Sequence, residues 1–503
     1  MSRIVAWFDE RMDLRGIYRG LLDRPVPSGL TWWHTLGSAT LTAFVVQVTT
    51  GIVLATFFSA SPDHAYDSVR YIEQHVVLGA FLRGLHTWGA SAMVVLALAH
   101  MLRVFSMGAY KYPREANWLV GVGLLALVIG FGFTGYLLPW DQKAYWGTQV
   151  GTSIAGTVPL VGPAIAVVLK GGTQLGAATL ARFYAVHVLW LPVFLVTLIA
   201  VHMLLVIRQG IAAPPRVLET GAPERTSSAE YAPFYRRVYA GTKHGERFWP
   251  DVVGKDLIVS LGLVLALVLL AWARGAALES PADPTDTNYV PRPEWYFLPF
   301  YQLLKLFPGS LESTVAVGVP LLGFIAVIGL PFYDRRSTRN LLHRPVALVS
   351  VSLLLAGSAL LLGLAVRELP AKGSTTAEAA PLAAPERAGR AMFERQCVSC
   401  HVVGGKGGDK GPDLTEVGLK HSSSWLHSFM ETPLHFHPES EMPAFGPPVL
   451  SHQEVEEVAR YVATLRGGPG TTRKPAFVDT FPQLIGPEKG APAAARPASK
   501  APR

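Results

Sequence analysis

The chain has 503 residues, of which half are hydrophobic and 16% are charged, and its formal net charge is +8. This composition is too apolar for an ordinary soluble enzyme, because soluble domains carry about 25% charged residues. The excess of Lys and Arg collects on one side of the expected membrane topology, so it requires no nucleic-acid partner.

Seven apolar segments are long enough to cross a bilayer, which takes about 20 residues in a helix. We predict them at 35–58, 85–106, 117–138, 184–207, 257–275, 314–333 and 345–366. The segments 153–170 and 296–307 are shorter or flanked by polar residues, and we expect interfacial hairpins there. Residues 7–17 mix apolar and charged side chains like an amphipathic helix on a membrane surface. The sequence predicts an all-α fold, a transmembrane bundle of about seven to eight helices.

The basic residues indicate the orientation of this bundle. With a cytoplasmic N-terminus, roughly twenty of them fall on the cytoplasmic side and about eight on the opposite side. An odd number of spans then carries the C-terminus outside. We therefore expect a multi-pass protein of the bacterial inner (cytoplasmic) membrane, with its C-terminal part in the periplasm.

Changes in composition predict the domain boundaries. The long charged loop 208–256 divides a four-helix front half from a three-helix back half, which gives domains at 1–210 and 211–368. Residues 369–385 form a linker of small and polar residues. Residues 386–466 form a small α-helical module, and the tail 467–503, rich in Pro, Ala, Gly and Lys, is expected to be disordered.

Two pairs of histidines lie within the apolar segments. His86 and His100 are fourteen residues apart, and His187 and His202 are fifteen apart. Because a helix has ~3.6 residues per turn, either spacing returns to nearly the same face roughly 21–23 Å further along. Two such helices side by side can bind two flat cofactors through paired imidazoles, as in bis-histidine ligation of haem. The alternative is four unrelated polar residues that neighbouring helices satisfy.

The direction of the spans assigns a depth to each pair. The second and fourth spans both run from outside to inside, so His86 and His187 lie near the outer surface. His100 and His202 then lie near the inner surface.

A second haem motif follows the last span. The run Cys397-Val-Ser-Cys400-His401 is the pattern of covalent c-type haem attachment, in which two thiols bind the haem and the histidine is an axial ligand. A disulfide, a metal knuckle and a redox dithiol are the alternatives. The chain has only these two cysteines, so an iron–sulfur centre would need another polypeptide.

Met442 is the expected sixth ligand of that haem, since thioether ligation is common in cytochromes c. The alternatives are that Met442 only fills the core, or that His435 or His437 binds the iron instead.

The four histidines, together with Pro293-Glu294-Trp295-Tyr296, resemble cytochrome b of the cytochrome bc/bf complexes over residues 1–366. Residues 386–466 resemble a single-haem class I cytochrome c. The supporting matches are the runs 138–142 and 182–187 and the glycine pairs Gly37/Gly51 and Gly121/Gly135. Each glycine pair is fourteen apart, and missing side chains there let a haem face approach the backbone.

The resemblance implies two non-covalent b-type haems, one covalent c-type haem, and quinone/quinol as substrate. It also implies that Arg83, Arg103 and Arg182 pair with haem propionates; snorkelling to lipid headgroups is the alternative.

The resemblance further implies two quinone sites. At the outer site, Glu294 accepts a proton from quinol beside Tyr296, Tyr136 and Tyr145. At the inner site the matching residues are Ser38, Arg208, Lys255 and Asp256, which could equally be polar residues of the membrane interface.

The function implied is that of the cytochrome b subunit of a bc-type quinol:cytochrome c oxidoreductase, a translocase. One electron from quinol passes through a separate Rieske iron–sulfur protein to the c-type haem, and the other crosses the membrane through both b haems. The further partners implied are a cytochrome c or terminal oxidase, membrane lipid, and a second copy in a homodimer. The alternatives are a non-bifurcating subunit of a quinone-linked dehydrogenase, and a haem sensor or electron wire.

The chain also departs from its relatives. The spacing of fifteen between His187 and His202 resembles the plant-type and Gram-positive branch, whereas the undivided front and back halves resemble the respiratory branch. The plant type carries an extra haem on a cysteine near the first span, but residues 33–35 contain none.

Overall fold

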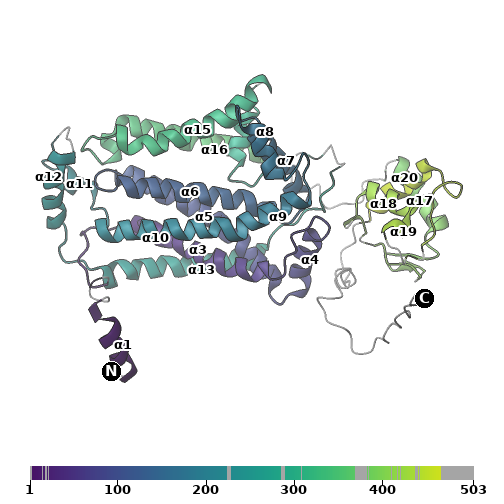
Figure 1. Cartoon of the computed structure of the whole chain (residues 1–503), viewed down its shortest axis with the longest axis horizontal. Helices are drawn as coiled ribbons and strands as arrows, with labels where there is room; N and C mark the ends of the chain where they lie inside the picture. Colours follow the sequence, from purple (N-terminus) through teal and green to yellow (C-terminus); the bar gives the residue numbers. More distant parts are fainter. Residues whose placement is uncertain are drawn as a thin grey trace, which may run out of the picture. The chain divides into compact units, whose positions relative to one another are not determined.

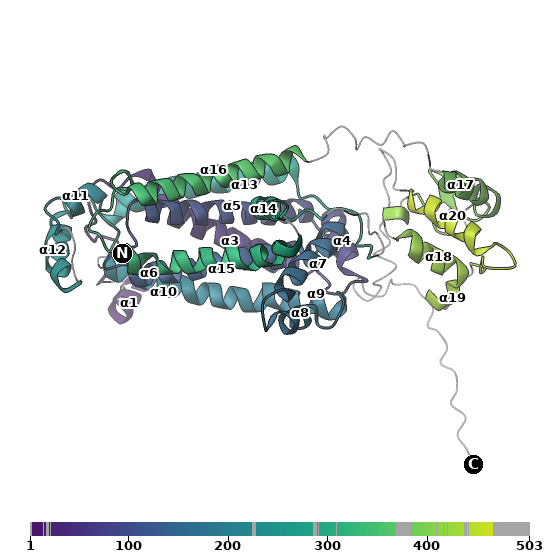
Figure 2. The ribbon, with the colours of Figure 1, turned by 90° about the horizontal axis from the view of Figure 1, so that it is seen from above.

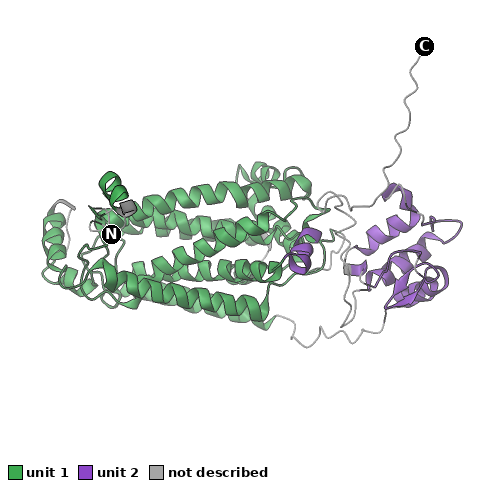
Figure 3. Cartoon of the chain, turned by 90° about the horizontal axis from the view of Figure 1, so that it is seen from below, with its two compact units in different colours: residues 1–66, 77–380 green, residues 67–76, 381–503 purple. Residues whose placement is uncertain are grey.

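The computed structural model describes residues 3–13, 15–16, 20, 22–223, 228–284, 289, 291–307, 309–368, 382, 384–408, 410–415, 417–419, 421–436, 440 and 442–465. Most of the predicted linker, the whole predicted tail 467–503 and His437 lie outside the described residues. The chain divides into two compact units, residues 1–66 with 77–380 and residues 67–76 with 381–503 (Figure 3).

The first unit is a bundle of long apolar helices, which confirms the predicted all-α membrane fold. Among the described residues, seven helices are long and apolar enough to cross a membrane. They run alongside one another in two perpendicular views (Figures 1 and 2). They are η1–α3 (Trp32–Thr35, Leu36–Ala55), α5 (Gly79–Ser106), α6 (Glu115–Tyr136), α9–η2–α10 (Ala177–Ala185, Val186–Trp190, Leu191–Gln209), η3–α13 (Phe248–Val252, Val253–Arg274), α15 (Gly309–Tyr333) and α16 (Pro345–Arg367).

All seven helices overlap the predicted spans, and several begin earlier than predicted. The fourth, for example, starts at Ala177 instead of 184. Hydropathy marks the apolar middle of a span, whereas the helix continues outward as long as its backbone hydrogen bonds are made. The segments predicted to be interfacial contain only the shorter helices α7 (Gln142–Gly156), α8 (Gly162–Lys170) and α14 (Leu298–Leu304).

Short helices gather at the two ends of this bundle (Figure 1). At the N-terminal end lie α1 (Arg3–Met12), α11 (Pro215–Glu219) and α12 (Ser228–Gly241), and the turn η4 (Leu341–His343) precedes α16. Helices α7, α8 and α14 belong to the opposite end. Helix α4 (Ala65–His75) follows the first span in the chain.

A buried ionic cluster joins two loops at the N-terminal end of the bundle. Lys111 Nζ, on the loop between α5 and α6, lies 2.8 Å from Asp334 Oδ1 just after α15. The Tyr110 hydroxyl donates a hydrogen bond to Asp334, and Arg344 Nη1 donates one of 2.9 Å to the Tyr110 oxygen. The carboxylate therefore holds two cationic side chains that have little access to water.

The second unit has its own small core. Its elements are α17 (Ala384–Gln396), the antiparallel strands β1 (Val402–Val403) and β2 (Lys406–Gly407), η5 (Val417–Leu419), α18 (Ser423–Glu431), α19 (Pro433–Phe436) and α20 (His452–Ala463). Phe393, Leu426, Val455 and Val458 are buried together between α17, α18 and α20. Helices α17 and α20 cross so closely that a Cβ at Gly389 would lie 1.9 Å from the Glu457 carbonyl oxygen.

Candidate functional site

Each of the four predicted histidine ligands faces one of the four predicted glycines. A Cβ at Gly51 would lie 3.2 Å from His86 Cε1, and a Cβ at Gly135 would lie 2.7 Å from His187 Cε1. The inner pair repeats the arrangement, with 3.2 Å between Gly37 and His100 and 3.8 Å between Gly121 and His202. The glycines therefore leave room beside the imidazoles at two depths in the bundle.

The inner pair has the spacing that one bound metal ion requires. The ring centroids of His100 and His202 are 6.4 Å apart with an interplanar angle of 76°. Bonds of about 2 Å from a metal to each imidazole nitrogen place the two centroids roughly 6 Å apart. Nδ1 of both rings is buried and has no hydrogen-bond partner among the described residues. Buried rings with unused nitrogen atoms fit the ligation of a haem iron.

The outer pair is oriented by two threonines that sequence reasoning missed. Thr50 Oγ1 lies 2.8 Å from His86 Nδ1, and Thr134 Oγ1 lies 2.9 Å from His187 Nδ1. Each threonine immediately precedes the glycine that faces the same ring. Because Nδ1 is engaged, Nε2 is the nitrogen left for a metal, as is usual for histidine ligands with a second hydrogen-bond partner.

The spacing of fifteen residues between His187 and His202 has a structural cause. The segment Val186–Trp190 forms a π-helical turn, η2, within the fourth span. A π turn closes its hydrogen bond over one more residue than an α turn. The extra residue is absorbed there, so His187 and His202 keep nearly the relative face and depth that the spacing of fourteen gives His86 and His100.

The three arginines predicted to pair with propionates have different surroundings. Nε and Nη2 of Arg103 are buried and lack a partner among the described residues, which suits an anionic group. Arg83 instead donates to the carbonyl oxygens of Ala276 and Ala277, at 3.1 and 2.7 Å. Arg182 is exposed and donates to the Val168 carbonyl oxygen.

The Pro-Glu-Trp-Tyr segment, which precedes α14, contacts both α6 and α7. Lys143 Nζ, in the first turn of α7, lies 2.6 Å from Glu294 Oε1. A Cβ at Gly132 of α6 would lie 2.9 Å from the Tyr296 hydroxyl oxygen. Gly132 is three residues from Gly135, which faces His187. Glu294 therefore belongs to the same end of the bundle as the outer histidine pair.

Aromatic rings surround this segment. The centroid of Phe297 lies 4.8 Å from that of Tyr296 and 6.5 Å from that of Tyr136. Tyr136 and Tyr296 are thereby brought together with the Glu294 loop. Tyr145 packs instead against Trp140 and Trp146, at centroid distances of 5.8 and 5.4 Å, and lies two residues after Lys143.

Carboxylates near Glu294 form a second feature missed from the sequence. Glu279, on the loop after α13, accepts a hydrogen bond of 2.7 Å from the Tyr289 hydroxyl. Burial, opposed by this hydrogen bond, raises the pKa of Glu279, and the charges of Asp141 and Glu294 raise it further. A carboxyl that retains its proton to higher pH can exchange protons with a neighbour.

Of the four residues predicted at the inner site, two are in contact. Ser38 Oγ donates a hydrogen bond of 2.6 Å to Asp256 Oδ1. Lys255 Nζ donates to the Leu30 carbonyl oxygen at 2.8 Å, while the Arg208 side chain is exposed. His34, to which the sequence assigns no role, has a buried Nε2 without a partner among the described residues.

In the second unit the Cys-x-x-Cys-His motif follows α17. Cys397 and Cys400 form no disulfide with each other, which leaves both sulfur atoms available to a haem. His401 Nδ1 lies 2.8 Å from the Pro412 carbonyl oxygen, so Nε2 is available for a metal. Met442 is half-buried against the core of the unit, and His435 is exposed.

Buried pairs of imidazoles in membrane helices, with a haem-attachment motif in a separate small unit, define a membrane-embedded electron-transfer protein. Comparisons specify the class. Residues 21–210 match the family model "Cytochrome b/b6/petB", residues 281–381 match "Cytochrome b(C-terminal)/b6/petD", and residues 386–466 match "Cytochrome c".

Similar proteins carry related names. The chain is 43% identical over 222 residues to a menaquinol:cytochrome c reductase cytochrome b subunit of Geobacillus thermodenitrificans, covering 42% of this chain and 99% of the relative. It is 33% identical over 343 residues to a cytochrome bc complex cytochrome b subunit of Chlorobaculum thiosulfatiphilum, covering 67% and 75%. A solved structure titled "Hyperthermophilic respiratory Complex III" matches with 27% identity and a TM-score of 0.60, covering 72% of this chain and 91% of that chain.

The chain belongs to the cytochrome b/b6 family and carries a cytochrome c domain at its C-terminal end. As a cytochrome it binds haem, and the seven apolar helices in the described part of the chain make it a multi-pass membrane protein.

Proposed function

We propose that this chain is the cytochrome b subunit of a bc-type quinol:cytochrome c oxidoreductase, fused to a cytochrome c. The names of two relatives, a menaquinol:cytochrome c reductase subunit and a respiratory Complex III, support this function. The observation that carries the proposal is the contact of Tyr296, two residues after Glu294, with Gly132 of α6, about one turn from the glycine that faces His187. A quinol binding there has a proton acceptor and an electron acceptor on either side.

In this proposal His86 and His187 hold the outer b-type haem, and His100 and His202 hold the inner one. Cys397 and Cys400 would bind a c-type haem covalently, and His401 and Met442 would hold its iron. When bound, these groups accept and pass single electrons, and the protein sets their orientation and surroundings. The glycines exclude side chains from the haem faces, and Arg103 offers its unpaired guanidinium nitrogens to an anionic substituent. Arg83 and Arg182 remain weaker proposals for that role, since backbone carbonyls already accept their hydrogen bonds.

At the outer site Glu294 accepts a proton from a quinol hydroxyl. Lys143 holds its carboxylate by an ion pair until the proton arrives. Once Glu294 is neutral the attraction to Lys143 falls, and the side chain is free to turn toward Glu279. Tyr136 and Tyr296 lie beside this loop through their contacts with Phe297, and Tyr145 is proposed as a further member of the site.

At the inner site, Asp256 and Ser38 form a donor and acceptor pair for quinone. Lys255 and Arg208 are proposed to supply positive charge at the membrane surface, and His34 joins them as a candidate. The charges of Arg103 and Lys255 both act on the His34 ring, so it lies among the residues of this site.

We also propose an orientation in the membrane, a division into domains and a set of partners. We place the N-terminus in the cytoplasm and the cytochrome c domain in the periplasm of a bacterial inner membrane. We retain the domains 1–210, 211–368 and 386–466, with a Rieske protein, a further cytochrome c or terminal oxidase, and a second copy of the complex as partners. Two b-type haems, one c-type haem and quinone are the proposed cofactors and substrate.

The test is rapid mixing of quinol with the complex in the presence and absence of the Rieske protein. The c-type haem should be reduced only when the iron–sulfur protein is present. Reduction of the c-type haem at an unchanged rate without the Rieske protein would contradict the proposed two-branch electron path.

A further inference from the structure

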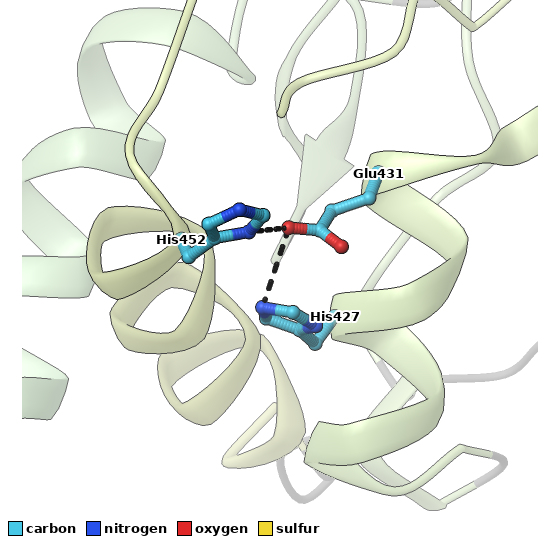
Figure 4. A group of neighbouring side chains, drawn as sticks. All are labelled: His427, Glu431 and His452. Carbon is cyan, nitrogen blue, oxygen red and sulfur yellow. Dashed lines mark hydrogen bonds and ion pairs between the residues drawn. The ribbon is translucent and has the colours of Figure 1, made fainter. Parts of the chain in front are cut away.

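Three potential metal ligands meet on the cytochrome c unit, outside every site described above (Figure 4). His427 and Glu431 are four residues apart on α18, which places them on one face of the helix. His452 is the first residue of α20. One carboxylate oxygen, Glu431 Oε1, lies 3.7 Å from His427 Nε2 and 2.5 Å from His452 Nδ1.

Capping interactions fix the starts of the two helices that carry these residues. Ser422 Oγ accepts a hydrogen bond of 3.1 Å from Trp425 N at the start of α18. Ser451 and Glu454 form a reciprocal capping box at the start of α20. Helices α18 and α20 also share the hydrophobic core of the unit through Leu426 and Val455. The Cα positions of the three ligands are therefore set by the fold, and only their side chains need to adjust.

The donor set suits a divalent transition metal. Two imidazole nitrogens and one carboxylate oxygen are typical zinc ligands, at about 2.0–2.2 Å from the ion. In a tetrahedral site such bonds separate the ligating atoms by roughly 3.4 Å. The three atoms here lie within 4.8 Å of one another. Side-chain rotations that move the ligating atoms by about 1 Å would bring them to tetrahedral spacing.

The exposure of the cluster allows an ion to enter. The His427 and Glu431 side chains are each 23% exposed, whereas that of His452 is 74% exposed. His427 and Glu431 on α18 are the less exposed ligands, and His452 approaches them from α20 on the exposed side. The open side leaves a fourth position for water.

We propose that His427, Glu431 and His452 bind one divalent transition-metal ion, with Zn²⁺ as the best match to this donor set. The ion would link the end of α18 to the start of α20. Met442 lies between these two helices in the chain, three residues before Phe445, whose backbone N donates a hydrogen bond of 2.8 Å to the Met430 carbonyl oxygen. Metal binding should therefore stabilise the part of the cytochrome c unit that carries Met442.

The test uses the purified, haem-loaded complex without an affinity tag, titrated with Zn²⁺ against a chromogenic chelator. His452→Ala and Glu431→Gln should each lose one Zn²⁺ equivalent per chain or weaken its binding at least tenfold. Glu456→Gln is the matched control, because Glu456 pairs with Arg460 on α20 outside the cluster, and this variant should bind Zn²⁺ as wild type does. Equal stoichiometry and affinity in wild type and His452→Ala would overturn the proposal.

A second measurement keeps the proposal testable if a variant does not fold. X-ray absorption at the zinc edge of the wild-type complex should show two imidazoles and oxygen around the ion. Coordination by oxygen alone would overturn the proposal. Neither measurement uses quinol, so the outcome is independent of the proposed oxidoreductase function.

Discussion

Lys143 Nζ and Glu294 Oε1 lie 2.6 Å apart, and this ion pair joins the first turn of α7 to the loop before α14. Both side chains are more than a quarter exposed, so the pair adds little to stability. The ion pair instead fixes the position of Glu294, the proposed proton acceptor, beside α7. The first two predictions follow from it.

Replacing Glu294 with Gln should lower the rate of quinol oxidation by roughly 10²-fold, since a positioned general base typically contributes 10²–10⁴-fold. The amide keeps the shape of the side chain but cannot accept the proton. Pre-steady-state reduction of the b haems by quinol measures this step. A wild-type rate in Glu294→Gln would mean that another group takes the proton.

Replacing Lys143 with Met should change quinol oxidation by a few-fold only, about 1 kcal/mol for a partly exposed pair. The expected change is in KM, because the carboxylate remains but is no longer held in one place. Lys305→Met is the matched control, since Lys305 forms a comparable exposed pair with Glu368 at 2.6 Å. If both variants behave alike, the Lys143 contact has no role at the site.

Thr50→Val and Thr134→Val should weaken binding of the outer b haem while leaving the inner one unchanged. Valine has nearly the shape of threonine but removes the hydroxyl beside Nδ1 of His86 or His187. Loss of such a partner typically costs 10–100-fold in metal affinity. Redox titration resolves the two b haems, and equal effects on both would contradict this assignment.

Alanine at the four glycines should give a graded loss of b haem. Gly135→Ala brings a methyl group within 2.7 Å of His187, whereas Gly121→Ala leaves 3.8 Å to His202. The first should lose outer haem, and the second should bind nearly as wild type. Gly262→Ala, with nothing near the added carbon, controls for changes in helix propensity. The ratio of haem to protein reports the result, and a reversed order would argue against close contact.

Asp334→Asn should destabilise the N-terminal end of the bundle by about 3 kcal/mol, because it leaves Lys111 and Arg344 buried without their anion. Burial raises the pKa of Asp334, but hydrogen bonds from Lys111 and Tyr110 outweigh it, so the net shift is downward. Burial also lowers the pKa of Lys111 to about 8, which leaves the lysine charged at neutral pH.

The direction of the Asp334 shift fixes the pH dependence. Because the folded-state pKa lies below the unfolded value of about 3.9, the contribution is complete above that value. It is lost as the pH falls through the lower folded pKa. Thermal unfolding of wild type should therefore lose stability in this acidic range, and Asp334→Asn should show less of that loss. A variant that unfolds at the wild-type temperature at neutral pH would contradict the account.

Features that repeat along the chain could be predicted from the sequence. The seven spans follow from hydropathy, and the histidine and glycine spacings of about fourteen place both residue types at two depths. The structure adds that each glycine faces one particular histidine, a pairing between helices that spacing alone does not reveal.

The parts that were missed depend on contacts between distant segments or on local backbone geometry. Thr50 and Thr134 look ordinary in sequence, because a threonine in an apolar helix can bond its own preceding carbonyl. The contact of Lys143 with Glu294 joins a helix to a loop about 150 residues further along the chain. The π turn at 186–190 has no simple sequence signal, although it accounts for the spacing of fifteen. The predicted role of Arg83 and Arg182 rests on their distance from a histidine in the sequence, and that distance does not reveal that backbone carbonyls accept their hydrogen bonds.

Haem analysis combined with a redox titration of the purified complex tests the central claim most directly. Pyridine haemochrome spectra should give two b-type haems and one c-type haem for each chain, and the two b haems should titrate separately. His86→Ala and His202→Ala should each remove one b haem and leave the c haem in place. Protein that retains both b haems in these variants, or that binds none in the wild type, would contradict the paired-histidine account.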